Sequence, residues 1–382
     1  MHIVEIEGYH LQAELPRTQG NSTGFVNRVE ALLIALRTDN GLVGWGETWF
    51  APAPSWAMIN SRLARHVLGK DPLDRNPIWQ GMSAERGYDR GGLTVMAMSA
   101  IDLALWDIAG HAAGVPVHRL LGGAVRNEVM AYASGPYFRP GTEPYKEYLT
   151  EIEAYLTQGF QAVKMRLGTN PAADHAITQA ARQLMGPDRL LAVDMNEGFT
   201  PATAIPIAEA ISDADIAWVE EPLLPDNLSG YQQLANRFPL PIAAGEALCG
   251  SEAFHDLIST NACAIIQPDL ALCGGLTEGV QIAGMAKAAG CLVAPHVIGT
   301  FVNVHAALQL LAVLPGRPAE PFRMHPIFEY DQTPSPLRNL LGDIPVAKNG
   351  TVAVPDAPGL GFNLDPARLE PFVTDSWTLR FS

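Results

Sequence analysis

The sequence predicts an α/β protein in which a β/α barrel follows a separate α+β unit. The chain of 382 residues is long enough for two domains. From about Val129 onward, short apolar runs alternate with helical patterns, as they do in a repeated β/α architecture. Asp194, Glu220 and Glu246 each close or follow such a run at intervals of 26 residues. That interval is about the length of one strand–helix–loop unit.

The residues before about Gly123 do not follow this rhythm and are predicted to form the α+β unit. The start of the chain alternates like a strand, and Asn40-Gly41 is a strong hairpin signal between two further strands. The predicted strands are Met1–Glu7, Val29–Arg37 and Leu42–Thr48. Helical spacing of apolar residues predicts helices over Ser55–Leu68 and Gly92–Ala113.

Two connections in this unit have the composition of lid loops. Residues Arg17–Gly24 are polar and bracketed by glycines, whereas Trp49–Pro54 is aromatic and stiffened by prolines. Ordinary surface connections have a similar composition, so both interpretations stand on the sequence alone.

The barrel prediction rests on eight strands with helices between them. The predicted strands are Val129–Ser134, Ala162–Leu167, Leu190–Asp194, Ile216–Glu220, Ile242–Gly245, Ala264–Gln267, Leu292–Pro295 and Ile327–Glu329. The predicted helices include Glu143–Gln158, Pro171–Met185, Pro201–Ser212, Ser251–Ser259, Leu276–Ala289 and Phe301–Leu314. No G-x-G-x-x-G or Walker-type loop follows the first strand, which disfavours a nucleotide-binding open sheet. The Pro- and Gly-rich tail after Asp331 is expected to pack back on the first unit.

Asp194, Glu220 and Glu246 are candidate metal ligands. The carboxyl ends of parallel barrel strands meet at one face, so these three carboxylates should converge there. Like charges repel and each is costly to desolvate, which a hard divalent cation would offset. An all-oxygen ligand set suits Mg²⁺. A single strand-end acid is more often a cap or a solvated loop residue, and the regular spacing is what favours the metal interpretation.

Further polar residues at strand ends suggest proton-transfer chemistry. Asp269 and His296 continue the spacing, and alternation places Lys164 and Arg166 on one side of the second barrel strand. Such a site suits removal of a proton next to a carboxylate, because a metal and cationic groups would stabilise the enolate. His296 would act as base, with Asp269 orienting its ring. The competing readings are a satisfied structural histidine and structural ion pairs.

The amino-acid composition limits the classes of binding partner and the cellular location that we expect. A net charge of −15 argues against nucleic acid or an anionic membrane surface. No apolar run long enough to cross a bilayer and no signal peptide are recognised, so a cytoplasmic location is expected. The four cysteines have neither C-x-x-C nor zinc spacing and are expected to be reduced and structural.

Over nearly its full length the chain resembles the mandelate racemase subgroup of the enolase superfamily, within the mandelate racemase/muconate lactonizing enzyme family. The matching motifs are Gly44-Trp45-Gly46-Glu47, Ala100–Asp107, Leu120–Gly123, Lys164-Met165-Arg166, Val193–Asn196, Val219-Glu220-Glu221-Pro222, Gly245-Glu246, Gln267-Pro268-Asp269, Gly274-Gly275 and Pro295-His296.

The resemblance implies an α/β fold with a modified TIM barrel, (β/α)7β, over residues 124–331. An N-terminal α+β capping domain over residues 1–123 would carry the lid loops, and residues 332–382 would pack back on it. The implied site has Mg²⁺ on the three carboxylates, a His296–Asp269 acid/base dyad and Glu329 as a hydrogen-bond donor to the substrate. Asn196 would lie beside the metal. The lid residues Asn21 and Trp49 would contact the substrate.

One residue departs from the pattern of the racemases in the family. They usually carry Lys-x-Lys on the second barrel strand, and the second lysine is a base; here that position is Arg166. Arginine keeps its proton at ordinary pH, so it is a poor base and a good partner for a carboxylate. One-base dehydration of an aldonate or aldarate to a 2-keto-3-deoxy acid is therefore the leading hypothesis, and Lys164 would hold the substrate carboxylate or polarise it.

Other functions stay open. An aldarolactone cycloisomerase is a close second within the family, followed by a racemase or epimerase. A zinc metallohydrolase should show His-x-His at a strand end, and the ten histidines include no such pair. A non-catalytic barrel protein would have little reason to keep both the carboxylates and His296. The resemblance also implies an even-numbered homo-oligomer, often an octamer.

Overall fold

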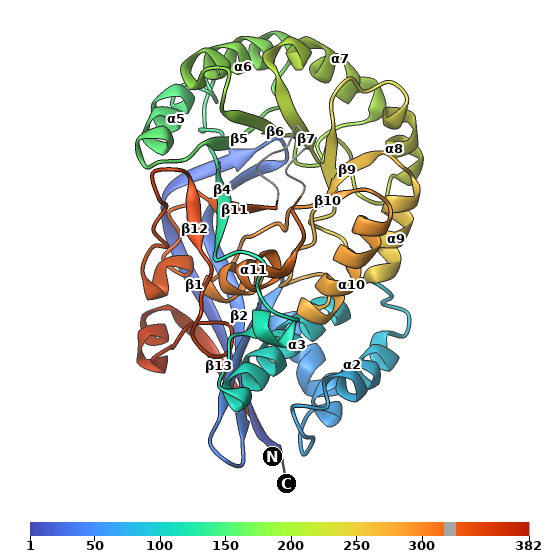
Figure 1. Ribbon diagram of the computed structural model, residues 1–382, viewed down its shortest axis with the longest axis vertical. Coiled ribbons are helices and arrows are strands. Elements are labelled where there is room, and N and C mark those ends of the chain that lie inside the picture. The colour runs from blue at the N-terminus through green and yellow to red at the C-terminus, as the bar shows by residue number, and fades with distance from the viewer. Residues whose placement is uncertain (317–325, 382) are drawn as a thin grey trace.

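The computed structural model describes residues 1–316 and 326–381. Figure 1 shows a barrel ringed by helices above a second unit that consists of long antiparallel strands and several helices. The barrel and its preceding α+β unit, both predicted from the sequence, are confirmed.

The capping sheet contains four antiparallel strands in the order β13-β1-β2-β3. Its strands are β1 (Ile3–Asn21), β2 (Gly24–Thr38), β3 (Val43–Thr48) and β13 (Val373–Arg380). The last of these comes from the far end of the chain and lies along β1, so residues of the tail complete the sheet.

The hairpin of β1 and β2 corrects one prediction. Residues Arg17–Gly24 are not a loop, because β1 continues to Asn21 and β2 begins at Gly24. The register shifts between Glu14 and Gln19, and beyond that point the ribbon leaves the body of the sheet. There it has no core face that would impose an apolar alternation, which explains why the sequence pattern is not that of a strand.

The capping helices are α1 (Pro52–Met58), α2 (Arg75–Ser83), α3 (Leu93–Ala113) and α4 (Val117–Leu120). The helix predicted over Ser55–Leu68 is divided, because α1 is followed by a π-helical turn at Ile59–Leu63 and a 3-10 turn at Ala64–His66. Sequence reasoning did not find α2, which buries only Ile78 and Met82.

Helix α3 packs tightly on β3, and glycines make this possible. A Cβ at Gly46 would lie 1.8 Å from the carbonyl oxygen of Ala100, and one at Gly44 would lie 2.3 Å from that of Ala104. By length and composition α3 could cross a bilayer, which corrects the expectation that no such stretch exists. Its apolar window is 89% buried inside the protein. The apolar character of α3 is therefore accounted for by packing.

The barrel sheet is parallel and nearly closed, in the order β10-β9-β8-β7-β6-β5-β4-β11. Its strands are β4 (Glu128–Ser134), β5 (Ala162–Arg166), β6 (Leu190–Asp194), β7 (Ile216–Glu220), β8 (Ile242–Ala244), β9 (Cys263–Ile266), β10 (Leu292–Val293) and β11 (Ile327–Asp331). Each lies within a few residues of the predicted strand. No ladder joins β10 to β11 in the described residues.

Helices surround this sheet (Figure 1). They are α5 (Tyr148–Thr157), α6 (Pro171–Met185), α7 (Pro201–Ile211), α8 (Leu228–Ala235), α9 (Ser251–Ser259), α10 (Gly275–Ala288) and α11 (Phe301–Val313). Helix α5 begins five residues later than the prediction of Glu143–Gln158. Helix α8 was not predicted, although Asn227 caps it by accepting a hydrogen bond from the backbone N–H of Gly230.

Two large aromatic rings and several small side chains fill the inside of the barrel. The rings of Tyr132 and Trp218 meet edge to face with their centroids 5.5 Å apart. The other members of this buried cluster are Ala162, Ala192, Ala243, Ile265, Ala294 and Ile327. The small alanine side chains leave the space that the two rings occupy. The inside of the barrel is therefore closely packed next to the site.

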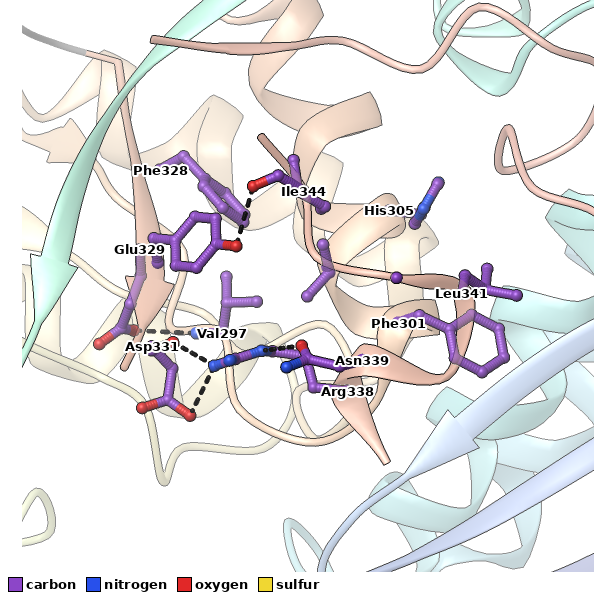
Figure 2. A pocket seen from close by; sticks show the side chains of 13 residues that line it. Val297, Phe301, His305, Phe328, Glu329, Asp331, Arg338, Asn339, Leu341 and Ile344 are labelled. Carbon is purple, nitrogen blue, oxygen red and sulfur yellow. Dashed lines mark hydrogen bonds and ion pairs between the residues drawn. The ribbon is translucent and has the colours of Figure 1, made fainter. Parts of the chain in front are cut away.

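No α-helix of the described chain follows β11, and the tail covers that side of the barrel. The segment includes a 3-10 turn, η5 (Arg338–Leu341), and encloses a cavity against the outer face of β11. Figure 2 shows Arg338 reaching back to Asp331. The hydroxyl of Tyr330 donates a hydrogen bond to the carbonyl oxygen of Ile344, 2.8 Å away. Farther along, β12 (Thr351–Ala353) pairs antiparallel with β4, and η6 (Pro366–Phe372) precedes β13. The arrangement is the (β/α)7β variant of the TIM barrel.

The β1–β2 hairpin reaches across the barrel mouth (Figure 1). Gly20 forms a two-hydrogen-bond bridge with Phe138, from the connection after β4. The hydroxyl of Ser22 donates to the carbonyl oxygen of Met195, 2.6 Å away, after β6. The amide of Gln19 donates to the hydroxyl of Thr333, 2.7 Å away, after β11. The hairpin is thus attached to three of the connections that surround the site.

Candidate functional site

The three evenly spaced carboxylates converge at the carboxyl end of the barrel. Asp194 ends β6, Glu220 ends β7 and Glu246 follows β8, and these strands are neighbours in the sheet. One oxygen of each carboxylate lies within 4.8 Å of the others. The side chains of Asp194 and Glu220 are buried, and that of Glu246 is partly exposed.

The electrostatics of this cluster fit a hard divalent cation. Burial, together with the neighbouring carboxylates, raises the pKa of Glu220, and it raises the pKa of Glu246 to about 8. Oδ2 of Asp194 is buried and has no hydrogen-bond partner among the described residues. Converging oxygens, like charges that repel one another and a carboxylate oxygen without a hydrogen bond together make a site that a bound Mg²⁺ would stabilise.

Two residues that sequence reasoning missed hold Glu220 in place. The indole N–H of Trp218 lies 3.1 Å from Oε2 of Glu220, and the amide of Gln267 lies 2.6 Å from the same oxygen. Both donors engage Oε2, whereas Oε1 accepts a hydrogen bond from Lys164 within the site. Strand alternation could have indicated Trp218, because residues two apart on a strand share a face.

Lys164 lies among the carboxylates. Its ammonium group is fully buried, 2.9 Å from Glu329 and 3.5 Å from Asp194, and also pairs with Glu220. Burial disfavours the charge on Lys164, but these carboxylates raise its pKa well above the ordinary value. The residue therefore supplies a fixed positive charge to the site.

Arg166 is held by contacts from the strand and loop of β4. Its guanidinium donates to the hydroxyl of Ser134, 2.8 Å away, and stacks on the ring of Tyr137 at 4.1 Å. Its Nε lies 3.7 Å from Oδ2 of Asp194. Burial opposes the charge, yet Tyr137 and Asp194 raise the pKa of Arg166 further above its ordinary value. A group that keeps its proton in this way cannot serve as a base.

His296 and Asp269 form a buried pair across the barrel from Lys164. Nδ1 of His296 lies 2.8 Å from Oδ2 of Asp269, and Nε2 lies 3.6 Å from Oε2 of Glu246. Burial lowers the pKa of His296, but Glu246, Glu329 and Asp269 together raise it to about 10. Glu246 contributes most among the carboxylates. Any cation that neutralises Glu246 therefore returns the pKa of His296 toward its ordinary value.

Glu329 joins the two flanks of the site. Its Oε1 faces Lys164, and its Oε2 accepts a hydrogen bond from the backbone N–H of Val297, 2.9 Å away (Figure 2). Burial raises the pKa of Glu329, but Lys164, His296 and Arg166 lower it to about 2. An ionised carboxylate only accepts hydrogen bonds, so the role of Glu329 as a donor to the substrate stays a prediction that requires the side chain to take up a proton.

The three residues predicted to bind the substrate differ in their hydrogen bonds. Asn196 lies beside the carboxylates, where its backbone N–H donates to Oδ1 of Asp194, 2.9 Å away. The side-chain oxygen of Asn21 accepts hydrogen bonds from Thr23 within its own hairpin turn, so that oxygen is not directed at the site. The indole N–H of Trp49 donates to Oδ2 of Asp269, 2.9 Å away.

Two further buried residues were also missed. The amide of Asn303 donates to Oδ1 of Asp269, 3.0 Å away, and to the carbonyl oxygen of Ile298. Glu47, at the end of the capping strand β3, accepts hydrogen bonds from Thr300 at the start of α11. These contacts join elements far apart in the chain, so no local sequence pattern indicates them.

Two family models match the chain. The model described as "Mandelate racemase / muconate lactonizing enzyme, N-terminal domain" matches residues 12–122. The model described as "Enolase C-terminal domain-like" matches residues 147–368. Together these matches span most of the capping sheet and the barrel.

Curated relatives include both isomerases and lyases. The chain is 34% identical to the D-galactarolactone cycloisomerase of Agrobacterium fabrum over 97% of this chain and 99% of that protein. It is 32% identical to the L-rhamnonate dehydratase of Saccharopolyspora erythraea over 93% of this chain and 88% of that protein.

Solved structures with the same fold include related enzymes. The 3,6-anhydro-D-galactonate cycloisomerase from Zobellia galactanivorans superposes with a TM-score of 0.87 at 31% identity, covering 98% of this chain and 100% of that one. A racemase from Streptomyces coelicolor A3(2) with bound magnesium superposes with a TM-score of 0.86 at 29% identity, covering 97% and 100%.

Proposed function

The chain belongs to the mandelate racemase/muconate lactonizing enzyme family of the enolase superfamily, and we propose that it is an enzyme of sugar-acid breakdown that removes the proton next to a carboxylate. The oxygen substituent on the neighbouring carbon then departs. When that substituent is a free hydroxyl, the reaction is a dehydration that gives a 2-keto-3-deoxy acid. This lyase activity is the leading candidate.

The observation that carries this proposal is the orientation of His296. Nδ1 faces Asp269, so Nε2 is left to face Glu246 and the carboxylate cluster. Because Asp269 accepts the hydrogen bond from Nδ1, Nε2 of the neutral ring carries the free lone pair. A substrate held against the cluster would present its α-proton to that lone pair. The resulting imidazolium would pass the proton to the departing oxygen.

Lys164 and Arg166 have complementary roles in the proposal. Both are buried, positively charged and across the barrel from His296. We assign them to binding the substrate carboxylate and to stabilising the charge that develops on it. Neither is suited to remove a proton, since their pKa values are raised. Proton transfer would therefore occur on one face of the substrate.

Asp194, Glu220 and Glu246 would hold Mg²⁺, whose positive charge would stabilise the enolate form of the substrate carboxylate. Trp218 and Gln267 engage Oε2 of Glu220, so Oε1, which pairs with Lys164, would be the oxygen that faces the cation. A relative with bound magnesium supports the choice of cation.

Lactone cycloisomerisation is the second candidate, favoured by the relatives that match nearly the whole chain. It begins with the same proton removal. The difference lies in the leaving oxygen: when it belongs to a ring, it stays attached to the molecule and no water is lost. A site with one base and no second base on the opposite face suits both reactions. A racemase needs bases on two faces, which Arg166 disfavours.

A substrate screen tests the proposal. The purified protein is mixed with Mg²⁺ and panels of aldonic acids, aldaric acids and aldarolactones, and the products are measured by mass spectrometry. A keto acid lighter than its substrate by one water molecule supports the dehydratase. A ring-opened product of unchanged mass supports the cycloisomerase. If no member of either panel is consumed and none exchanges its α-proton in D₂O, the proposal is wrong.

A further inference from the structure

The carboxylate of Asp269 is bound by four donors, and two of them lie outside the predicted dyad and its own loop. Oδ2 accepts from Nδ1 of His296 at 2.8 Å and from the indole N–H of Trp49 at 2.9 Å. Oδ1 accepts from the amide of Asn303 at 3.0 Å and from the backbone N–H of Ala271 at 2.8 Å. Asp269 itself is completely buried.

The two outside donors come from different parts of the fold. Trp49 directly follows the capping strand β3, which ends at Thr48, and Asn303 lies in the first turn of α11. The same end of β3 also carries Glu47, which accepts hydrogen bonds from Thr300 at the start of α11. The capping sheet, the helix and the catalytic carboxylate are therefore joined in one hydrogen-bonded group.

This arrangement has a direct physical effect on the histidine. A carboxylate that accepts a hydrogen bond from each of several directions cannot rotate about its last bond, and its charge is stabilised. The plane of Asp269 fixes the direction of the bond to Nδ1 and hence the plane of the imidazole. Removing the indole N–H would leave Oδ2 with one donor and would strengthen its attraction for the proton on Nδ1.

We propose that Trp49 and Asn303 are positioning residues, which fix Asp269 and through it the ring of His296. The capping strand thus takes part in building the base. This role is additional to the expected contact of Trp49 with the substrate, because its indole N–H is engaged by Asp269. The inference rests on the proposed role of His296 as the base.

Trp49→Phe tests the inference, and Trp106→Phe is a matched control. The control removes an indole N–H that also bridges the capping domain and the barrel, but donates to the hydroxyl of Thr277, 2.9 Å away. The proton between Nδ1 of His296 and Asp269 should give a far-downfield proton NMR signal, identified by its loss in His296→Asn. Trp49→Phe should shift this signal, whereas Trp106→Phe should leave it in place.

Kinetics with whichever acid or lactone the screen finds provide the second readout. Trp49→Phe and Asn303→Ala should each lower kcat about tenfold with little change in KM, because a hydrogen bond to a charged group is lost from the base rather than from the substrate. Mg²⁺ affinity should stay at the wild-type value. A purely structural role would instead reduce thermal stability without moving the NMR signal.

The outcomes separate the two proposals. An unshifted signal and an unchanged kcat in both Trp49→Phe and Asn303→Ala overturn the positioning role. A shifted signal in a protein that turns over no sugar acid or lactone supports the hydrogen-bonded group and contradicts the proposed function. If Asn303→Ala fails to fold, the NMR signal of Trp49→Phe decides the positioning role by itself, and this measurement needs no substrate.

Discussion

Glu47 of the capping sheet accepts hydrogen bonds from both the backbone N–H and the hydroxyl of Thr300, at the first turn of barrel helix α11. The backbone N–H lies 3.1 Å from each carboxylate oxygen. Gly299 adopts φ +105°, and a Cβ there would lie 2.4 Å from Oε1 of Glu47. The glycine lets a buried carboxyl group approach the helix, and this contact has a consequence for stability.

Glu47 should make stability fall with rising pH. Burial raises its pKa to about 8 from an ordinary value of 4.5, although Thr300 opposes the shift. Between pH 4.5 and about pH 8, Glu47 of the folded protein keeps a proton that the same residue releases in the unfolded chain. The free energy of unfolding therefore decreases as pH rises, by about 1.4 kcal/mol per pH unit for one proton.

Thermal unfolding of the wild type and Glu47→Gln across this pH window measures the effect. The variant cannot titrate at this position, so its melting temperature should fall less steeply. Asp102, whose pKa burial raises to about 7, is present in both proteins and cancels in the comparison. Parallel pH profiles would show that Glu47 is already ionised in the folded state.

Replacing His296 by Asn should abolish α-proton exchange while preserving the metal site. Loss of a general base lowers the rate by about a hundredfold to ten-thousandfold. Exchange of the α-proton of an acid found in the screen is followed by NMR in D₂O, and Mg²⁺ binding by calorimetry. His255→Asn changes an exposed histidine and should behave like the wild type. Undiminished exchange in His296→Asn would rule the residue out as the base.

Glu220→Gln should weaken Mg²⁺ binding, because it removes one of three converging charges. We expect the affinity to fall at least about tenfold. The comparison is with Glu209→Gln, which removes an equal charge from an exposed position on α7. Calorimetric titration with Mg²⁺ measures both variants. Equal affinities in the two would remove Glu220 from the set of ligands.

Gly46→Ala should destabilise the capping domain. The added methyl group would lie 1.8 Å from the carbonyl oxygen of Ala100, so β3 and α3 must separate. Overpacking of this kind costs about 1–3 kcal/mol. Gly24→Ala is the control, since nothing lies within 4 Å of a Cβ at that position. Its melting temperature should match that of the wild type, and a similar result for Gly46→Ala would falsify the packing argument.

The barrel was predictable because its strands repeat at a regular interval and end in polar residues. Asp194 and Glu220 are the final residues of neighbouring parallel strands, so spacing alone implied that they meet. The pairing of His296 with Asp269 followed from the same logic. These predictions needed only the alternation of strands and helices, which can be recognised from short stretches of the sequence.

Other features depended on contacts that no local pattern records. Residues Arg17–Gly24 at the tip of the β1–β2 hairpin have the composition of a loop, because beyond Glu14 the hairpin packs on connections of the barrel instead of a sheet core. The hydrogen bond from Asn303 to Asp269 requires α11 to be in place before it can be recognised. The low pKa of Glu329 depends on Lys164 and Arg166 from β5 and on His296 from the segment after β10, which are far apart in the chain.

The pairing of β13 with β1 also determines when the capping sheet can be completed during synthesis. Glu5 lies opposite Arg380, and Trp377 stacks on Trp56 with ring centroids 5.3 Å apart. Every barrel strand leaves the ribosome before the strand that forms this edge. The capping sheet therefore waits for a strand that follows all the barrel strands in the sequence, and a nascent protein carries a complete set of barrel strands next to an incomplete capping sheet.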